Sequence, residues 1–368
     1  MLNFDLPKFL GAIMAAAPRA GDVLLAVGCP PQVQTDGALV RLKMAGMERL
    51  TPFQTEAIVL HLLAAAPATA AARVRAEGAA HFAYSVPGVS RFRVAVFSQR
   101  GTFAVSLRTI PEHVPSLTDL RLPAAVREAC RERNGIVLVN GPAGSGRTTT
   151  LASMVAEINA ERACHVLTVE DPIEFLYRHA TATVNQREVG LDTSSVAVGL
   201  ADALRQGAQV LLVSEVRTVE EARLLLEAAE TGHLVLTTVR AFDTASAVRR
   251  VLALFPSEER PEARARLARV LRWSFTQQLL AHRDGRKPVA EVWRATRGAV
   301  ALLAEGPLDS ASVADMLRDG EPEGQMGFDR ALEQRVRTGE MEMEPAIANA
   351  VLPRQLELRL LDLREGRS

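Results

Sequence analysis

The stretch from Gly135 to Thr150, GIVLVNGPAGSGRTTT, decides the fold of this chain. Its first half is a short apolar run that predicts a buried strand. Its second half matches the pattern G-x-x-x-x-G-K-[ST] at every position except Arg147, where lysine is expected. Glycines at 141, 144 and 146 permit backbone angles that turn successive N–H groups toward an anion, and the segment 148–160 has helical composition. The stretch therefore predicts a strand, a phosphate-binding loop and a helix whose N-terminus faces the same anion.

The loop predicts a nucleotide site. We expect the Thr148 hydroxyl to bind Mg²⁺ and the whole loop to hold the phosphates of ATP, through Gly141, Pro142, Ala143, Gly144, Ser145, Gly146, Arg147, Thr148 and Thr149. A glycine-rich turn with no ligand is the alternative. Arg147 bears most on the choice, because a guanidinium is wider than the ammonium group of lysine.

Composition limits the class of protein. The chain has 368 residues, 48% hydrophobic and 23% charged, with a formal net charge of zero, which fits a soluble protein of two domains. A neutral balance does not favour a nucleic-acid partner. The three cysteines are far apart, as expected of reduced thiols in the cytoplasm. The apolar stretches 9–17 and 59–74 are too short or too interrupted for an integral membrane segment, and we expect no targeting segment.

Residues 1–111 predict an α+β domain. A helix over 9–17, a strand over 21–28, a hairpin from 33, a helix over 51–79 and strands over 91–97 and 102–108 are expected. Residues 112–123, which follow Pro111 and include Pro115, predict a linker.

Residues 124–368 predict an α/β domain with a helical C-terminal part. Uniformly apolar runs alternate with helical stretches, which favours a parallel sheet covered on both faces; the runs are 136–140, 166–169, 210–213 and 234–239. After Phe255-Pro256 we expect mostly helix, with one hairpin at Asp284-Gly285 and an apolar helix over 299–306.

Acidic residues follow two of the apolar runs. Glu170 and Asp171 end the run 166–169, and Glu215 follows the run 210–213. Ligands of open α/β sheets bind beyond the carboxyl ends of the strands, so Glu170 and Asp171 are candidates to help place Mg²⁺ and water. Glu215 is a candidate general base for the attacking water. Helix capping or a simple strand-end acid are the alternatives. His233, which precedes the next run, is either a catalytic or a structural residue.

Several motifs together resemble the secretion and twitching-motility ATPase superfamily, most closely the type IV pilus retraction ATPases. They are the phosphate loop, Glu170-Asp171-Pro172-Ile173-Glu174-Phe175, the segments 184–189 and 229–235, Phe255-Pro256, and 86–94 with 107–111 in the N-terminal part. The resemblance spans nearly the whole chain.

The resemblance implies a PAS-like N-terminal domain followed by a RecA-like P-loop ATPase domain. It implies a hexameric ring at the cytoplasmic face of the inner membrane, where ATP with Mg²⁺ drives a pilus platform protein. Arg93 and Arg108 fall where the family places arginines that bind the γ-phosphate, and Glu215, Glu170 and His233 are the other catalytic candidates. No Cys-x-x-Cys occurs, and the absence of such a zinc site favours the retraction branch.

The chain departs from the family pattern at residues expected to touch the nucleotide. Arg147 replaces the loop lysine, and Arg240 stands where the family has a second histidine. Two hypotheses remain open: a motor that hydrolyses ATP weakly, or a catalytically inactive paralogue that acts as a regulatory or structural subunit of a homomeric or mixed ring. A nucleic-acid motor on the same core is a third and weaker hypothesis.

Overall fold

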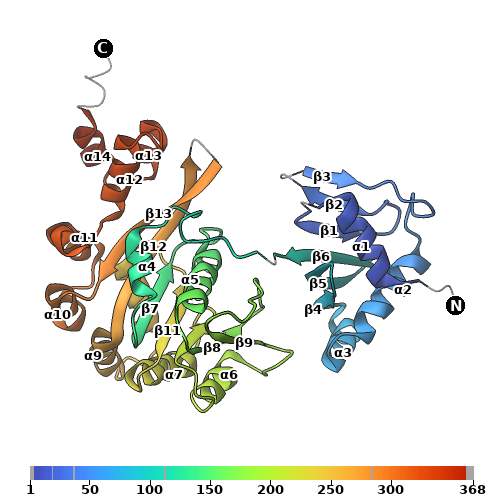
Figure 1. The fold of residues 1–368 in the computed structure, drawn as a ribbon, viewed down its shortest axis with the longest axis horizontal. Coiled ribbons are helices and arrows are strands. Elements are labelled where there is room, and N and C mark those ends of the chain that lie inside the picture. The colour runs from blue at the N-terminus through green and yellow to red at the C-terminus, as the bar shows by residue number, and fades with distance from the viewer. Residues whose placement is uncertain (1–3, 19, 36–37, 112, 283–284, 362–368) are drawn as a thin grey trace. The chain divides into compact units, whose positions relative to one another are not determined.

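A computed structural model describes residues 4–18, 20–35, 38–111, 113–282 and 285–361 (Figure 1). The chain forms two compact units: unit 1 comprises residues 1–113 and 174–176, and unit 2 comprises residues 114–173 and 177–368. Most of the stretch predicted as a linker, 114–123, therefore belongs to unit 2, and residue 112 lies outside the described residues. The fold class agrees with the prediction, an α+β unit followed by an α/β unit.

Unit 1 is a six-stranded antiparallel sheet with three helices. The sheet order is β3-β2-β1-β6-β5-β4. The strands are β1 Asp22–Leu25, β2 Gln32–Thr35, β3 Ala38–Arg41, β4 Ala79–Val86, β5 Ser90–Gln99 and β6 Thr102–Ile110, and the helices are α1 Leu6–Ala16, α2 Pro52–Ala64 and α3 Ala68–Glu77. Its core combines the apolar faces of the helices with alternate strand residues, among them Leu10, Ile58, Phe92, Val94 and Leu107.

The predictions for unit 1 hold for most strands and fail for one helix. The expected hairpin from residue 33 is β2–β3, although its turn at 36–37 lies outside the described residues. The single helix predicted over 51–79 is wrong: it is two helices, because Pro67 starts a new one, and Ala79 already belongs to β4. Thr51 caps α2 as expected, accepting a hydrogen bond from the Gln54 N–H at 3.3 Å.

Unit 2 is built on a seven-stranded sheet of order β13-β12-β7-β11-β10-β8-β9. All neighbours are parallel except the hairpin β12–β13. The strands are β7 Gly135–Asn140, β8 His165–Glu170, β9 Thr183–Glu188, β10 Val210–Val213, β11 Leu234–Val239, β12 Leu271–His282 and β13 Gly285–Arg294. The helices are α4 Ala124–Ala129, α5 Arg147–Glu161, α6 Val196–Ala203, α7 Val219–Glu230, α8 Thr244–Ala253, α9 Arg260–Val270, α10 Arg297–Glu305, α11 Ser310–Asp319, α12 Phe328–Arg337, α13 Met343–Asn349 and α14 Pro353–Arg359, with a 3₁₀ turn at Glu321–Glu323.

The central strands are buried on both faces, as their uniform apolar sequences predict. Every residue of β7, β10 and β11 is buried. Ile136 and Leu138 face a core shared with α6 to α9, whereas Val137 and Val139 face a core shared with α4 and α5. The alternation of a pleated strand thus divides one apolar run between two layers of helices.

The last two strands are longer than the sequence predicts. Residues 271–294 were expected to be mostly helical around a short hairpin, but β12 and β13 form a long hairpin that extends the sheet beside β7. A third apolar cluster, which includes Leu280, Val289, Phe328 and Leu332, packs α12 to α14 on this hairpin. These helices lie around the upper part of β12 and β13 in Figure 1.

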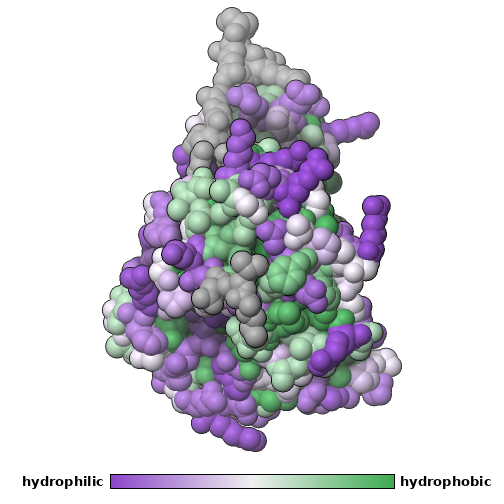
Figure 2. All heavy atoms as spheres, turned by 90° about the vertical axis from the view of Figure 1, so that its right-hand side faces the viewer, coloured by the Kyte–Doolittle hydropathy of each residue, from purple (hydrophilic) through white to green (hydrophobic). Residues whose placement is uncertain are grey.

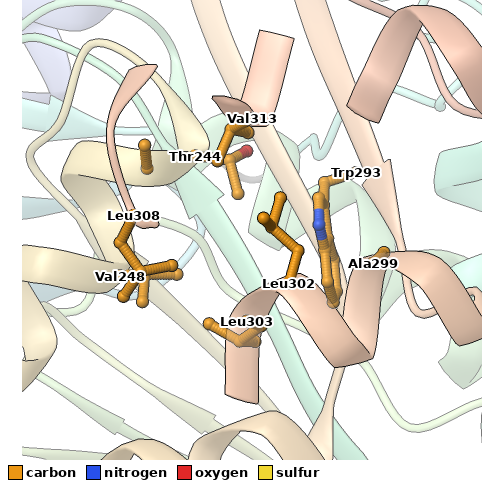
Figure 3. A pocket seen from close by; sticks show the side chains of 9 residues that line it. Thr244, Val248, Trp293, Ala299, Leu302, Leu303, Leu308 and Val313 are labelled. Atoms are coloured by element: carbon orange, nitrogen blue, oxygen red, sulfur yellow. The ribbon is translucent and has the colours of Figure 1, made fainter. Parts of the chain in front are cut away.

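The apolar helix expected over 299–306 is α10. It covers a small hollow together with α8, α11 and β13 (Figure 3). The lining is apolar apart from Thr244, and includes Trp293, Leu302 and Val313. Such a lining suits helix packing and offers no cationic group for a phosphate.

Exposed apolar side chains are spread over both units. They include Phe53 and Leu60 on α2, Phe242 before α8 and Leu358 on α14. On the face drawn in Figure 2, hydrophobic areas near the middle lie among hydrophilic side chains. No helix in the described residues has the length and apolar character required to cross a bilayer.

Candidate nucleotide-binding site

The predicted phosphate loop lies between the end of β7 and the start of α5. Gly141, Gly144 and Gly146 have φ values of 149°, 75° and 85°, all in the range that favours glycine. A Cβ atom on Gly141 would lie 2.3 Å from the carbonyl oxygen of Gln277 and 2.4 Å from Ser145 Oγ. The close approach of the backbone to β12 therefore requires glycine at this position.

The side chain of Gln277 on β12 holds Ser145 in the loop and Thr150 in the first turn of α5. This side chain, only 1% exposed, donates from Nε2 to the Ser145 carbonyl at 2.7 Å. Its Oε1 accepts the hydroxyl of Thr150, in the first turn of α5, at 2.9 Å. Gln277 is not among the predicted site residues, because it lies in a stretch whose sequence predicts mostly helix.

The exposed part of the loop presents backbone and the first turn of α5. Ala143, Gly144 and Thr148 are exposed, whereas Arg147 and Thr149 are half-buried. One guanidinium nitrogen of Arg147, Nη1, is fully buried. The N-terminus of a 15-residue helix adds partial positive charge beside these backbone groups. Glycine at the crowded positions, exposed backbone and a helix N-terminus together fit a polyphosphate.

A buried polar cluster lies directly behind the loop. Asn140, the last residue of β7, donates to Ser274 Oγ at 2.7 Å. The Thr244 hydroxyl lies 3.1 Å from the same Ser274 oxygen, and the Thr244 N–H donates to Glu291 Oε1 at 2.9 Å. Burial raises the pKa of Glu291 to about 7, against the lowering effect of its hydrogen bond from Thr244. The cluster joins β7, β12, β13 and the start of α8.

The acidic residues lie at the same sheet edge as the loop. In the strand register Asn140 pairs with Val239, and Val213 pairs with both Thr237 and Val169. Residues that follow these strands are therefore neighbours along the carboxyl edge, in the order Gly141, Arg240, Glu215 and Asp171. Ligands of parallel sheets bind at this edge.

Glu170 is buried at the end of β8. Its Oε1 accepts hydrogen bonds from the Thr168 hydroxyl at 2.6 Å and from Gln186 Nε2 at 3.1 Å. Gln186 belongs to β9, so this acid is fixed between two strands. A carboxylate held in this way can orient water but has little freedom to move.

Glu215 and Asp171 share a network of arginines. Nε of Arg240 lies 3.0 Å from Glu215 Oε2, and Nη2 of Arg217 lies 3.4 Å from the same oxygen. Nη1 of Arg217 lies 3.6 Å from Asp171 Oδ2. The sequence identified Arg240 only as a departure from a motif, and its contact with Glu215 could not be predicted.

His233 lies away from this edge. It precedes β11, so it stands at the amino edge of the sheet, and its Nδ1 lies 2.9 Å from the carbonyl oxygen of Ala228. The structure therefore does not bring His233 to the phosphate loop of its own unit. Arg240, at the other end of β11, occupies the edge where the loop lies.

Arg93 and Arg108 belong to unit 1 and are direct partners across β5 and β6. Arg108 also pairs with Asp22 on β1, with Nε 2.8 Å from Oδ1. The hydrogen bond to Asp22 and its charge raise the pKa of Arg108. Two arginines directly opposite each other on one exposed face suit the binding of an anion, since like charges at this spacing repel.

Among the described residues no group of three or more His, Cys, Asp or Glu side chains could hold a metal ion. A magnesium ion would therefore depend on phosphate oxygens and water, with Thr148 and Asp171 as the available protein ligands. The exposed hydroxyl of Thr148 suits this role, and Asp171 would have to exchange its contact with Arg217.

Comparison with known proteins decides the family. The model of the type II/IV secretion system protein family matches residues 36–294. The chain belongs to this family. The type IV pilus retraction ATPase PilT of Pseudomonas aeruginosa is 34% identical over 95% of this chain and 99% of its own length. The type IV pilus ATPase PilU of the same organism is 33% identical over 92% of this chain and 87% of its own length.

A solved structure supports the same fold. The crystal structure of the pilus retraction motor PilT with bound ADP matches with a TM-score of 0.85 and 34% identity, over 95% of this chain and 98% of that chain. The predicted membership of the pilus retraction branch is thus confirmed at the level of sequence and fold.

Proposed function

We propose that this chain is a motor subunit of a type IV pilus machine that binds ATP with Mg²⁺ and hydrolyses it. One observation carries the proposal: a glycine loop that Gln277 fixes lies at the same sheet edge as Glu215, in a chain whose fold matches an ADP-bound pilus retraction motor. The subunit works in a hexameric ring at the cytoplasmic face of the inner membrane and acts on a pilus platform protein. The hexameric ring and its place at the membrane are proposed because the chain resembles type IV pilus ATPases.

Each residue of the site has its own role in the proposed hydrolysis of ATP. The loop residues 141–149 bind the phosphates, and Thr148 with Asp171 holds the ion, which neutralises phosphate charge when bound. Glu215 accepts a proton from the attacking water, and Glu170 orients that water through its fixed carboxylate. Arg93 and Arg108 supply charge to the terminal phosphate, as arginines do in other ATPases. His233 belongs to this list only if it acts on a neighbouring subunit of the ring.

Arg147 favours a second candidate, a ring subunit that binds nucleotide without turnover. A guanidinium is planar and wider than an ammonium group and does not replace it at a compact phosphate contact. In that case the chain joins a ring formed with a lysine-bearing paralogue.

Calorimetry with ADP and phosphate-release assays at millimolar Mg²⁺ test both candidates. We expect micromolar binding of ADP and slow turnover, and Glu215→Gln to retain binding while its turnover falls about 100-fold or more. If the wild-type chain binds ADP and releases no phosphate, the second candidate holds. If ADP does not bind at all, both are wrong.

A further inference from the structure

The Glu215 carboxylate contacts two guanidinium groups through the same oxygen. Arg240 Nε lies 3.0 Å and Arg217 Nη2 lies 3.4 Å from Oε2. Among the residues that the structure describes, none donates a hydrogen bond to Oε1. The two arginines therefore hold the carboxylate by one oxygen and leave the other for water.

The two arginines differ in the use of their remaining nitrogens. Arg217 directs Nη1 to Asp171 Oδ2 at 3.6 Å, so both of its terminal nitrogens face carboxylates. Arg240 contacts Glu215 through Nε alone. Within the described ranges, neither Nη1 nor Nη2 of Arg240 donates a hydrogen bond, and its side chain is 53% exposed. Arg240 therefore offers two unused donors at the sheet edge.

The position of Arg240 lies between the loop and the candidate base. The loop follows β7, Glu215 follows β10, and Arg240 follows β11, the strand between them. Adjacent strands are about 4.8 Å apart, so the loop strand and the base strand are separated by about 10 Å. The loop would hold the terminal phosphate, and Glu215 would activate the water that attacks it. Both would therefore lie between β7 and β10, at the carboxyl end of β11.

We propose that Arg240 is a specificity-determining residue that recognises the terminal phosphate of a nucleoside triphosphate while its Nε holds Glu215. Its two unused nitrogens donate to the γ-phosphate, which a diphosphate lacks. The inference rests on the proposed nucleotide site and adds to it a residue that distinguishes ATP from ADP. A guanidinium suits this double contact because its donors form a planar fork, whereas an ammonium group is a single point charge.

The test is calorimetric titration of the full chain, at millimolar Mg²⁺, with ADP and with the non-hydrolysable imidodiphosphate analogue of ATP. In Arg240→Gln we expect the Kd of the analogue to rise about tenfold or more, equal to about 1.4 kcal/mol. The Kd of ADP should change less than twofold. Arg223→Gln is the matched control, because it breaks the Arg223–Glu259 ion pair, a 2.6 Å contact between α7 and the segment before α9. Neither Kd should change in that control.

Other results overturn the inference in distinguishable ways. If the wild-type chain binds neither ligand, the nucleotide site itself is wrong. If it binds both and Arg240→Gln weakens both equally or neither, only the role of Arg240 is wrong. Arg217→Gln removes the other contact to Glu215 Oε2. If this variant weakens the analogue as much as Arg240→Gln does, the effect comes from loss of the ion pair with Glu215 and the direct phosphate contact is wrong. Melting temperatures of all variants separate these results from misfolding.

Discussion

The Thr150 hydroxyl donates to Gln277 Oε1 at 2.9 Å, although the two residues are 127 positions apart in the sequence. The same glutamine donates to the Ser145 carbonyl at 2.7 Å. β12 therefore supports the phosphate loop. The conformation of the loop depends on this strand, which is distant from the loop in the sequence.

We expect Gln277→Leu to loosen the loop. The change leaves the Thr150 hydroxyl and the Ser145 carbonyl without their partner in a buried place, and each such group costs about 1–3 kcal/mol. Urea unfolding should show a loss of about 2–6 kcal/mol, and calorimetry should show weaker ADP binding. Gln278→Leu is the control, since Gln278 is the next residue on β12 and makes no side-chain hydrogen bond among the described residues. Equal losses in the two variants would exclude a specific role for Gln277.

In unit 2 the sequence predicted the strands that are mostly apolar and missed the length of β12, which carries more polar residues. β7, β10 and β11 were predicted because they are buried on both faces. β12 was missed because Thr276 and Gln277 interrupt its apolar pattern. These two residues are buried because they bind the polar cluster and the loop. Thr276 and Gln277 are polar because they form hydrogen bonds at the site. Hydrophobic periodicity cannot distinguish such buried polar residues from exposed ones.

The sequence predicted the candidate site best where its residues are neighbours in the sequence or directly follow a strand. The glycine loop and the acids at the strand ends do lie at one sheet edge, as the rule for parallel sheets predicts. The predicted His233 precedes β11 and stands at the amino edge, whereas Arg240 follows β11 and stands at the carboxyl edge with the loop. The ion pair between Arg240 and Glu215 joins two strands through side chains, and no spacing in the sequence encodes it.

We expect Arg147→Lys to increase ATP turnover. Lysine places a compact charge on a flexible stem at the phosphates, whereas the arginine carries a wider group with one buried nitrogen. The expected gain in kcat/KM is about tenfold, or about 1.4 kcal/mol of transition-state stabilisation. Phosphate release measures it.

The double variant Arg147→Lys with Glu215→Gln is the control for contaminating ATPases and should show only background rates. Turnover that stays at the wild-type level in Arg147→Lys, with ADP affinity unchanged, would show that the arginine does not limit the reaction.

Glu291 should make folding stability depend on pH. Burial, with smaller contributions from the nearby charges of Asp243 and Asp329, raises its pKa to about 7. The folded state therefore prefers the protonated acid, so this contribution is fully present below the unfolded pKa of 4.5 and is lost as pH rises through about 7. The difference corresponds to about 3 kcal/mol.

We expect Glu291→Gln to remove this dependence, because the amide is neutral at every pH and its oxygen still accepts the Thr244 N–H. Urea unfolding at pH 5, 6, 7 and 8 measures the slope of stability against pH. Glu305→Gln, at the exposed end of α10, should leave the slope as it is in the wild-type chain. A slope that is identical in all three proteins would mean that Glu291 is charged throughout.

Glu333 should hold the C-terminal helices together. Its carboxylate, 5% exposed on α12, contacts Arg337 Nε at 2.9 Å, Arg330 Nη1 at 3.1 Å and, from α14, Arg359 Nη1 at 3.7 Å. Glu333→Ala leaves these cations without their common partner, but each arginine is about 36–41% exposed and becomes hydrated, so the expected cost is about 1–3 kcal/mol. Hydrogen exchange should show faster exchange in α14 and unchanged protection in β7, because the helices pack on the far part of the hairpin.

Glu77→Ala removes an exposed ion pair of unit 1 and should cost at most about 1 kcal/mol. A loss in Glu333→Ala no larger than in Glu77→Ala would show that solvent or neighbouring carboxylates replace Glu333 without cost.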